Sequence, residues 1–215
     1  MNTEVARTQM LGQQVRAWEV LDERVLDALA SVPRERFVPD AWRELAFADI
    51  AIPLPHGEEM MAPKLEGRLL QALRLAPEHH VLEIGTGTGF LAACLARLAG
   101  SVVSIDVHED FIAAAGRRLS GLAGRVSLET ADAFTYTPGD HFDAIAVTGS
   151  LPQMDQRLLQ WLKPDGRMFV VTGEAPVMEA SVWTRAGADH FTCESLFETV
   201  LGPLRNAPRP SAFRL

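Results

Sequence analysis

Cysteine is scarce in this chain of 215 residues, which contains only Cys94 and Cys193. The two lie far apart in apolar contexts, so we interpret them as small buried thiols rather than as a disulfide or a redox site. Long apolar runs are also missing: no segment reaches the length of a membrane span, and the N-terminal residues lack the apolar core of a signal peptide. We therefore expect a cytoplasmic protein without a membrane partner.

Basic residues are outnumbered, with 20 Lys and Arg against 28 Asp and Glu and a net charge of -8. A surface that binds a nucleic acid duplex needs clustered cations, so this balance argues against nucleic acid as a partner. The six histidines show no paired spacing of metal ligands, and we expect no metal. The oligomeric state is left open by the sequence.

Three stretches of different character divide the chain, which has the length of one structural domain. Residues 1–63 predict an N-terminal cap segment, with helical patterns over about residues 4–31, a cap at Asp22, and an irregular proline-rich part after Pro33. Residues 64–204 predict the core. Residues 205–215 form a tail rich in Pro and Arg that we expect to be mobile.

Short apolar runs alternate with helical patterns from residue 64 onward. We expect helices at 65–75, 90–99, 110–122 and 154–162, and strands at 81–84, 101–106, 125–130, 141–149 and 166–173. This alternation is typical of a parallel sheet covered on both faces. Two β-leaning runs around Gly187 predict an antiparallel edge. The expected fold class is α/β, a Rossmann-like, mostly parallel, doubly wound sheet.

Three glycines at alternate positions, Gly85, Gly87 and Gly89, follow the strand pattern VLEI and precede a helix. Their missing side chains permit a tight turn and close approach of a ligand. A dinucleotide fingerprint requires glycine where Phe90 stands. Glu83 would repel a pyrophosphate but attract an ammonium or sulfonium group. The loop therefore favours S-adenosylmethionine, with an NAD-dependent oxidoreductase as a lower-ranked alternative.

Two further acids follow predicted strands. Asp106, followed by Val107, stands where the hydroxyls of a ribose need acceptors, and Asp132, followed by Ala133, stands where an adenine amino group needs one. Each aspartate taken alone is better explained as a helix N-cap. Together with Glu83 they mark the ends of successive strands, which line one crevice, and we interpret them as cofactor ligands.

Five segments of the chain resemble the protein-L-isoaspartate O-methyltransferase family. They are SVPRERFVP (31–39), DIAIPLP (49–55), VLEIGTGTGF (81–90), FDAIAVT (142–148) and LKPDGR (162–167), and the resemblance covers about residues 10–204. It implies a class I methyltransferase fold, S-adenosylmethionine as donor, and methylation of the carboxylate of L-isoaspartyl residues in damaged proteins or peptides. The cofactor residues predicted from the motifs and the resemblance are Glu83, Gly85, Thr86, Gly87, Gly89, Asp106, Val107, Asp132 and Ala133.

One segment departs from that family. Where the family has Gly-Gln-Thr-Ile-Ser-x-Pro-His, this chain has GEEMMAPK at 57–64, so Met61 replaces the acceptor-side serine and Lys64 replaces the histidine. Losing one hydrogen bond to a charged group costs roughly 1.5–3 kcal/mol, or about ten- to hundred-fold in rate. The turn TGSLP, which begins at Thr148, offers a hydroxyl. Met61, Lys64 and Thr148 are the acceptor-side candidates, and no catalytic residue is assigned.

Three hypotheses on function follow. The first is an isoaspartyl O-methyltransferase engaged in protein repair. The second is a methyltransferase of the same fold with a different, small and apolar acceptor, suggested by Met60 and Met61. The third is a protein that binds the donor without turnover.

Overall fold

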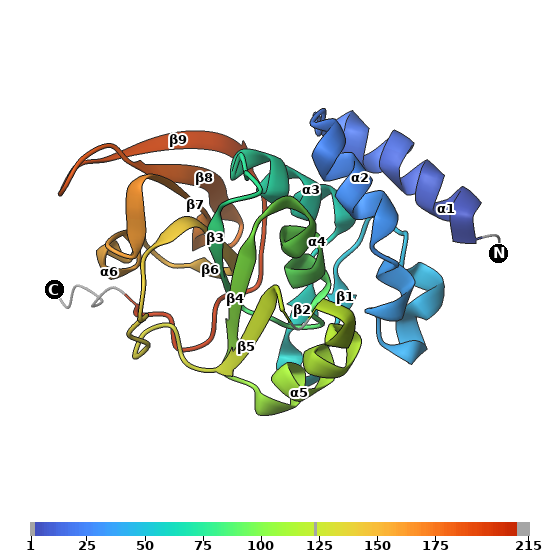
Figure 1. The fold of residues 1–215 in the computed structure, drawn as a ribbon. Helices are drawn as coiled ribbons and strands as arrows, with labels where there is room; N and C mark the ends of the chain where they lie inside the picture. Colours follow the sequence, from blue (N-terminus) through green and yellow to red (C-terminus); the bar gives the residue numbers. More distant parts are fainter. Residues whose placement is uncertain (1–2, 123, 210–215) are drawn as a thin grey trace, which may run out of the picture.

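The computed structural model describes residues 3–122 and 124–209 and is built around a seven-stranded sheet (Figure 1). The strand order is β5-β4-β3-β6-β7-β8-β9. These strands are β3 (His80–Ile84), β4 (Ser101–Asp106), β5 (Val126–Thr130), β6 (Phe142–Leu151), β7 (Leu162–Glu174), β8 (Val177–Arg185) and β9 (Phe191–Glu198). Neighbours from β5 to β7 pair parallel, whereas β8 and β9 pair antiparallel. The predicted mostly parallel sheet with an antiparallel edge is confirmed.

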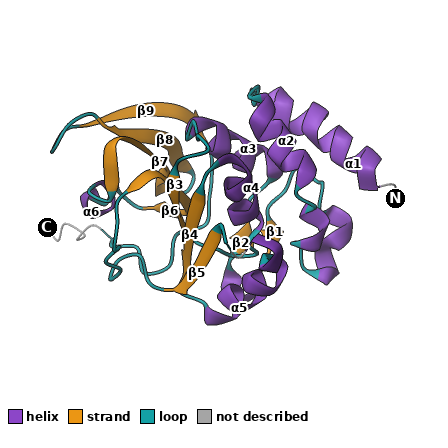
Figure 2. Cartoon of the chain, viewed as in Figure 1, coloured by secondary structure: helices purple, strands orange, loops and turns teal. Residues whose placement is uncertain are grey.

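Helices cover the two faces of the sheet unequally (Figure 2). They are α1 (Thr3–Met10), α2 (Glu23–Ser31), α3 (Pro63–Ala72), α4 (Phe90–Leu98), α5 (Glu109–Arg118) and α6 (Gln156–Leu159). Val81 of β3 belongs to the cluster that packs under α2, α3 and α4, whereas its neighbour Leu82 belongs to a second cluster under α6. This alternation follows from the pleat of a strand and explains why both Val81 and Leu82 are apolar.

The helix predicted at 154–162 was wrong in length. Asp155 caps α6 by accepting from the backbone N–H of Arg157 at 3.0 Å, but the helix ends at Leu159. The chain must rejoin the sheet at once, because Leu162 is already paired with Phe142 and the carbonyl of Trp161 accepts from the N–H of Phe142 at 2.8 Å. Tertiary pairing overrides the local helical pattern here.

The N-terminal helical pattern is broken into pieces. A π-helical turn, η1 (Leu11–Val15), and a 3-10 turn, η2 (Arg16–Trp18), follow α1, and Glu19 then adopts a left-handed conformation with φ 62°. Asp22 caps α2 as predicted by accepting from the N–H of Arg24 at 2.9 Å. The expected irregular segment contains three 3-10 turns and a pair of two-residue strands: η3 (Arg34–Arg36), η4 (Asp40–Leu45), η5 (Pro55–Gly57), β1 (Ile52–Pro53) and β2 (Glu59–Met60).

Two expectations about the surface need correction. Cys94 is buried, but Cys193 is exposed on β9, an edge strand with one open face, and both thiols are free. The tail is held in place at its start, because Arg205 binds Glu58 at 2.6 Å and Asn206 binds Asp132 at 2.8 Å. Residues 210–215 lie outside the described residues.

Over the described ranges, no helix combines the length and apolarity required to cross a membrane.

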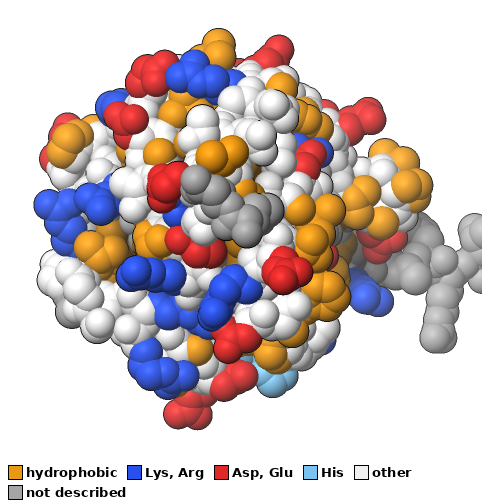
Figure 3. All heavy atoms as spheres, turned by 90° about the vertical axis from the view of Figure 1, so that its right-hand side faces the viewer, with side chains coloured by type: hydrophobic (Ala, Val, Ile, Leu, Met, Phe, Trp, Pro, Cys, Tyr) orange, Lys and Arg blue, Asp and Glu red, His pale blue; other side chains and the backbone are white. Residues whose placement is uncertain are grey.

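Charges of both signs are interspersed with apolar side chains on the face that carries the N-terminal helices (Figure 3). Many of the ion pairs in the described part of the chain are local, such as Arg24 with Asp22 at 2.7 Å. Exposed pairs of this kind contribute little to the free energy of unfolding.

One buried ion pair joins the irregular segment to the core. Arg34 is 1% exposed, and its guanidinium donates to the carboxylate of Glu66, to the carbonyl of Met61 at 2.7 Å and to the carbonyl of Ala46 at 2.8 Å. It also lies 4.8 Å from the centre of the Phe90 ring. Burial raises the pKa of Glu66 to about 7, although the charge of Arg34 opposes this shift.

We expect Arg34→Met to lower the free energy of unfolding by about 3–5 kcal/mol, because it leaves the carboxyl of Glu66 and two carbonyls buried without their donor. Urea unfolding followed by circular dichroism measures the loss. Arg36→Met is the matched control, since Arg36 lies in the same turn but is exposed, and it should change stability by less than about 0.5 kcal/mol. Equal effects of the two substitutions would contradict the structural importance of the pair.

Candidate functional site

The site lies where the strand order reverses, between β3 and β6. In open parallel sheets the crevice at such a switch point, beyond the carboxyl ends of the strands, is where ligands bind. A cavity of about 470 Å³ opens there, within the range of roughly 300–1,000 Å³ typical of small-molecule sites. Among the predicted residues, its walls include Met61, Glu83, Gly85, Thr86, Gly87, Asp106, Val107, Ala133 and Thr148.

The first glycine of the loop is required by the turn itself. Gly85 has φ 97°, and a Cβ at this position would lie 2.1 Å from Oγ1 of Thr148. That hydroxyl lies 2.9 Å from the carbonyl oxygens of both Ile84 and Gly85 and donates to them. Thr148 thus ties the end of β3 to β6. Its hydroxyl already has acceptors, so it serves the shape of the loop.

The second glycine leaves bare backbone at the cavity wall. Gly87 has φ 49°, and in the described part of the chain a Cβ built on it would meet only Cδ1 of Leu54, at 3.6 Å. Space therefore remains beside the main chain, as a closely approaching ligand requires.

Gly89 has a different physical role from the one predicted. It is the left-handed N-cap of α4, and a Cβ there would lie 3.0 Å from Cβ of Ala115 and 3.2 Å from Cδ1 of Leu119. Its missing side chain lets α4 pack against α5. Gly89 does not line the cavity.

Glu83 provides a buried carboxyl group beside the cavity, with one oxygen unpaired. Its side chain is fully buried, Oε2 accepts from the hydroxyl of Ser104, and Ser104 is hydrogen bonded to Thr86 at 2.6 Å. Oε1 has no hydrogen-bond partner among the described residues. Burial raises the pKa of Glu83 to about 8, with Ser104 opposing the shift and the charge of Asp106 adding to it. A cationic group in the cavity would satisfy this oxygen.

Asp106 stands opposite, at the end of β4, and is 8% exposed. One carboxylate oxygen accepts from the N–H of Gly87 and the other from the N–H of His108, both at 2.9 Å. Burial raises the pKa of Asp106, and the two N–H groups oppose this. Each oxygen retains lone pairs for a further donor, as a pair of ribose hydroxyls would provide.

Asp132 does not line the cavity. One of its oxygens accepts from the N–H of Phe134 at 2.9 Å, which caps the turn, and the other accepts from the side chain of Asn206 at 2.8 Å. Like those of Asp106, each oxygen has one donor and keeps a lone pair, so the two aspartates differ in their place: Asp106 lines the cavity and Asp132 caps a turn beside it. The neighbouring Ala131 and Ala133 supply the wall instead.

The three acceptor-side candidates are separated by the fold. Met61 lines the cavity and is 4% exposed, and its carbonyl is held by Arg34. Met60 beside it accepts from the hydroxyl of Thr88 at 3.7 Å. Lys64 turns away, because its ammonium group binds Asp49 at 2.7 Å and lies 4.3 Å from the ring centre of Trp18.

Many residues of the cavity wall belong to no motif that can be recognised in the sequence. Segments far apart along the chain supply it, and only the fold brings them together. The lining residues that sequence reasoning missed include Leu54, Glu58, Glu66, Thr88, His108, Phe111, the segment 201–205 and Arg209. Glu66 could have been suspected, because it directly follows the segment 57–64, which differs from the family pattern. Its pairing with Arg34, however, depends on tertiary structure.

The parallel sheet, its switch point, the glycine loop after β3 and the acid after β4 define a class I methyltransferase fold. Residues 6–206 match the model of one family within this class, described as protein-L-isoaspartate(D-aspartate) O-methyltransferase. The chain belongs to the protein-L-isoaspartate O-methyltransferase family.

Relatives with curated names agree with this assignment. The chain is 34% identical to protein-L-isoaspartate O-methyltransferase 1 of Rhodopseudomonas palustris, over 97% of this chain and 89% of the relative. It is 37% identical to protein-L-isoaspartate O-methyltransferase of Methylorubrum extorquens, over 86% of this chain and 82% of the relative. The alignments cover nearly the whole chain, including the N-terminal segment.

Solved structures share the fold. A putative protein-L-isoaspartate O-methyltransferase of Plasmodium falciparum, in complex with S-adenosyl-L-homocysteine, superposes with a TM-score of 0.82 at 16% identity, over 95% of this chain and 99% of that one. A second protein-L-isoaspartate O-methyltransferase gives 0.78 at 22% identity, over 92% and 65% of the two chains. At these identities the likeness concerns the fold.

The raised pKa of Glu83 predicts a pH dependence of stability in the absence of ligand. The folded pKa of about 8 exceeds the usual value of 4.5, so the folded state holds a proton that the unfolded chain releases. The resulting stabilisation is complete below about pH 4.5 and is lost as the pH rises through 8, by at most about 1.4 kcal/mol per pH unit.

Glu83→Gln removes this titration, so its free energy of unfolding should fall less than that of the wild type between pH 5 and 8.5. Chemical unfolding at a series of pH values measures both slopes. Glu129→Gln, an exposed carboxyl on β5, is the control and should keep the wild-type slope. Parallel curves for wild type and Glu83→Gln would contradict the prediction.

Proposed function

We propose that this chain is an S-adenosylmethionine-dependent O-methyltransferase that esterifies the carboxylate of L-isoaspartyl residues in damaged proteins. The observation that carries the proposal is the cavity at the switch point, with the open oxygen of Glu83, in a member of this family. Isoaspartyl-containing proteins or peptides as partners belong to the proposal, as does the cytoplasmic location inferred from the sequence.

The residues present fit the donor. S-adenosylmethionine, when bound, supplies a methyl group activated on a sulfonium. Glu83 would hold its positively charged amino-acid part, Asp106 would accept from the ribose hydroxyls, and the main chain at Gly87 would pack against the nucleoside. Val107 and Ala133 provide apolar wall next to the base.

On the acceptor side, the reaction requires correct placement of the acceptor carboxylate and no general base. A carboxylate with an ordinary pKa near 4 is ionised at neutral pH, so no residue has to remove a proton. Attack of an anion on a sulfonium forms two neutral products, which a weakly polar surrounding favours. Leu54, Met60 and Met61 supply that surrounding. The methyl ester formed then promotes closure to a succinimide, which reopens to a normal aspartyl bond.

Substitutions of Asp106 and Asp132 distinguish an aspartate that binds the donor from one that only caps a turn. Asp106→Asn should weaken binding of S-adenosylhomocysteine about 10- to 100-fold, as expected for loss of charged hydrogen bonds. Asp132→Asn should change it by less than about threefold, because Asp132 does not line the cavity. Isothermal titration calorimetry measures both. The reverse order of effects would overturn the placement of the donor.

The activity itself is tested with labelled S-adenosylmethionine and a peptide containing L-isoaspartate, with the same peptide containing L-aspartate as control. Base-labile label should appear on the first peptide only. Met61→Ser should raise the rate, by up to about 10- to 100-fold, because it adds a hydroxyl that can donate to the acceptor carboxylate. Met61→Ala removes the thioether without adding a donor and should not raise it.

A second function is favoured by one observation, the buried apolar pair Met60 and Met61 at the cavity. These side chains suit a small apolar acceptor bearing a hydroxyl or carboxyl group. If this is the native reaction, the isoaspartyl peptide remains unlabelled and Met61→Ser impairs methylation of the apolar acceptor. Donor binding without methylation of either acceptor class would leave a donor-binding protein without turnover.

A further inference from the structure

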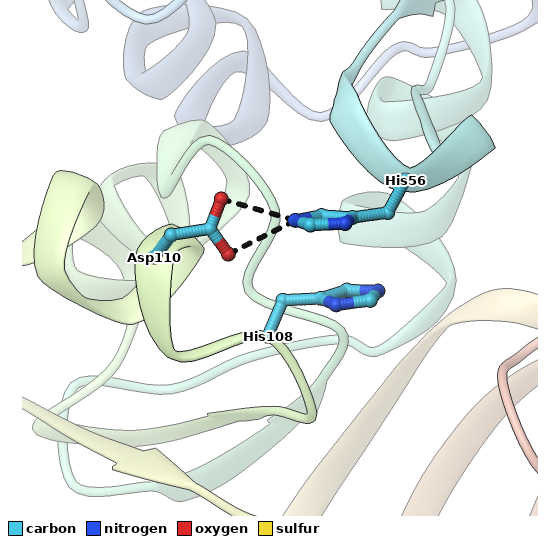
Figure 4. Close-up of side chains that lie close together, drawn as sticks. All are labelled: His56, His108 and Asp110. Carbon is cyan, nitrogen blue, oxygen red and sulfur yellow. Dashed lines mark hydrogen bonds and ion pairs between the residues drawn. The ribbon is translucent and has the colours of Figure 1, made fainter.

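Two histidines and an aspartate from two different elements lie close together (Figure 4), next to the cavity that His108 lines. His56 comes from the turn η5, and His108 and Asp110 come from the start of α5. One ligand atom from each of the three lies within 4.8 Å of the others. Nε2 of His56 lies 3.0 and 3.1 Å from the two oxygens of Asp110. Two imidazoles and a carboxylate are the donor set that zinc and related divalent ions prefer.

The distances suit one ion after a small rearrangement. Two ligand atoms on a tetrahedral zinc, at bonds of about 2.0–2.1 Å, lie about 3.4 Å apart. The separation of His56 and Asp110 is close to this, so an ion can replace the proton between them. The rings of His56 and His108 are stacked, 4.1 Å apart and 6° from parallel, so one ring must turn to direct its lone pair at the ion. The side chain of His56 is 42% exposed and has room to turn.

The local charge favours a dication. Glu58 and Asp110 lie next to the two imidazoles, Asp106 accepts from the backbone N–H of His108, and the nearby cation Arg205 is bound to Glu58 at 2.6 Å. Asp110 therefore retains a carboxylate that Arg205 does not neutralise. His56 itself has φ 63°, a left-handed conformation that is uncommon for a side-chain-bearing residue and often marks functional positions.

We propose that His56, His108 and Asp110 form a binding site for one divalent transition-metal ion of the zinc class. Glu58 lies within reach as a further ligand, because its Oε1 is 3.4 Å from Nε2 of His108. The site joins the N-terminal segment to the start of α5 across the cavity mouth, where Glu58 and His108 both line the wall. A bound ion therefore ties these two walls together.

The test is a direct binding measurement on the full chain, without a histidine tag and after removal of metals by a chelator. Zinc is titrated against the protein in competition with a chromophoric chelator. We expect one ion per chain for the wild type. Affinity should fall at least about tenfold for His56→Ala and for His108→Ala, and more for the double variant, because each loses a direct ligand.

Two controls and one further ligand variant make the test specific. The double variant His141→Ala/His190→Ala removes two exposed imidazoles elsewhere and should bind like the wild type. Cys193→Ser removes the exposed thiol, an alternative zinc ligand, and should also leave the site intact. Asp110→Asn retains the shape of the side chain and removes its charge, and it should weaken binding.

A second measurement keeps the proposal falsifiable if one variant folds poorly. Zinc should raise the midpoint of thermal unfolding of the wild type and of His141→Ala/His190→Ala, but not that of His56→Ala/His108→Ala. Absence of a stoichiometric site in the wild type, or a site that survives in His56→Ala/His108→Ala, would overturn the proposal. Neither readout involves methyl transfer, so failure here is distinguishable from failure of the proposed function.

Whether a bound ion links the two cavity walls is tested separately, by the dissociation rate of a donor-site ligand. This test rests on the proposed donor. Dissociation of S-adenosylhomocysteine should be slower with zinc in the wild type and unaffected by zinc in His56→Ala/His108→Ala. Zinc that binds at these residues without slowing dissociation would overturn the link between the two walls.

Discussion

The buried guanidinium of Arg34 holds together parts of the chain that have few backbone hydrogen bonds of their own. Residues 32–62 contain only short turns and two-residue strands, so their path is fixed by side chains rather than by a ladder. Arg34 binds the carbonyls of Ala46 and Met61 and the carboxylate of Glu66, which lies on α3. The acceptor side of the cavity thus depends on one residue that does not line it.

Two buried carboxyl groups at the cavity contrast in how they are paired. Glu66 has a permanent cation in Arg34, whereas Glu83 has a hydroxyl donor on one oxygen and no partner in the described structure on the other. Both have raised pKa values because both are buried. The first stabilises the fold, and the second leaves an unfavourable desolvation that a cationic ligand relieves. The protein thereby gives up some stability at the position where, under the proposed function, the positive charge of the donor would bind.

The features that local sequence patterns determine were predicted well. Runs such as VLEI and SVVSID, bounded by glycine or an acid, indicated the parallel strands, and the spacing of Gly85 and Gly87 indicated a tight turn after β3. The resemblance to the family was carried by motifs spread over the chain, so fold and family followed from it.

Features that arise from contacts across the chain were not predicted. Asp132 follows a strand like Asp106, but it does not line the cavity, and one of its oxygens accepts from Asn206, 74 positions away. Lys64 stands beside the acceptor motif, yet Asp49 and Trp18 draw its ammonium group outward. The exposure of Cys193 depends on which face of an edge strand remains uncovered. The cluster of His56, His108 and Asp110 has no local spacing because two elements contribute to it.

The segment 201–205 lies along β6 and completes the cavity wall. Ser150 of β6 donates to the carbonyl of Gly202 and accepts from the N–H of Leu204, both at 2.8 Å, and the absence of a side chain at Gly149 makes room for the main chain of Leu204. During synthesis on the ribosome, β3 to β7 emerge well before these residues do. The sheet can therefore assemble on a nascent chain whose cavity is still open along one side, and the cavity wall is complete only after residues 201–205 have been translated.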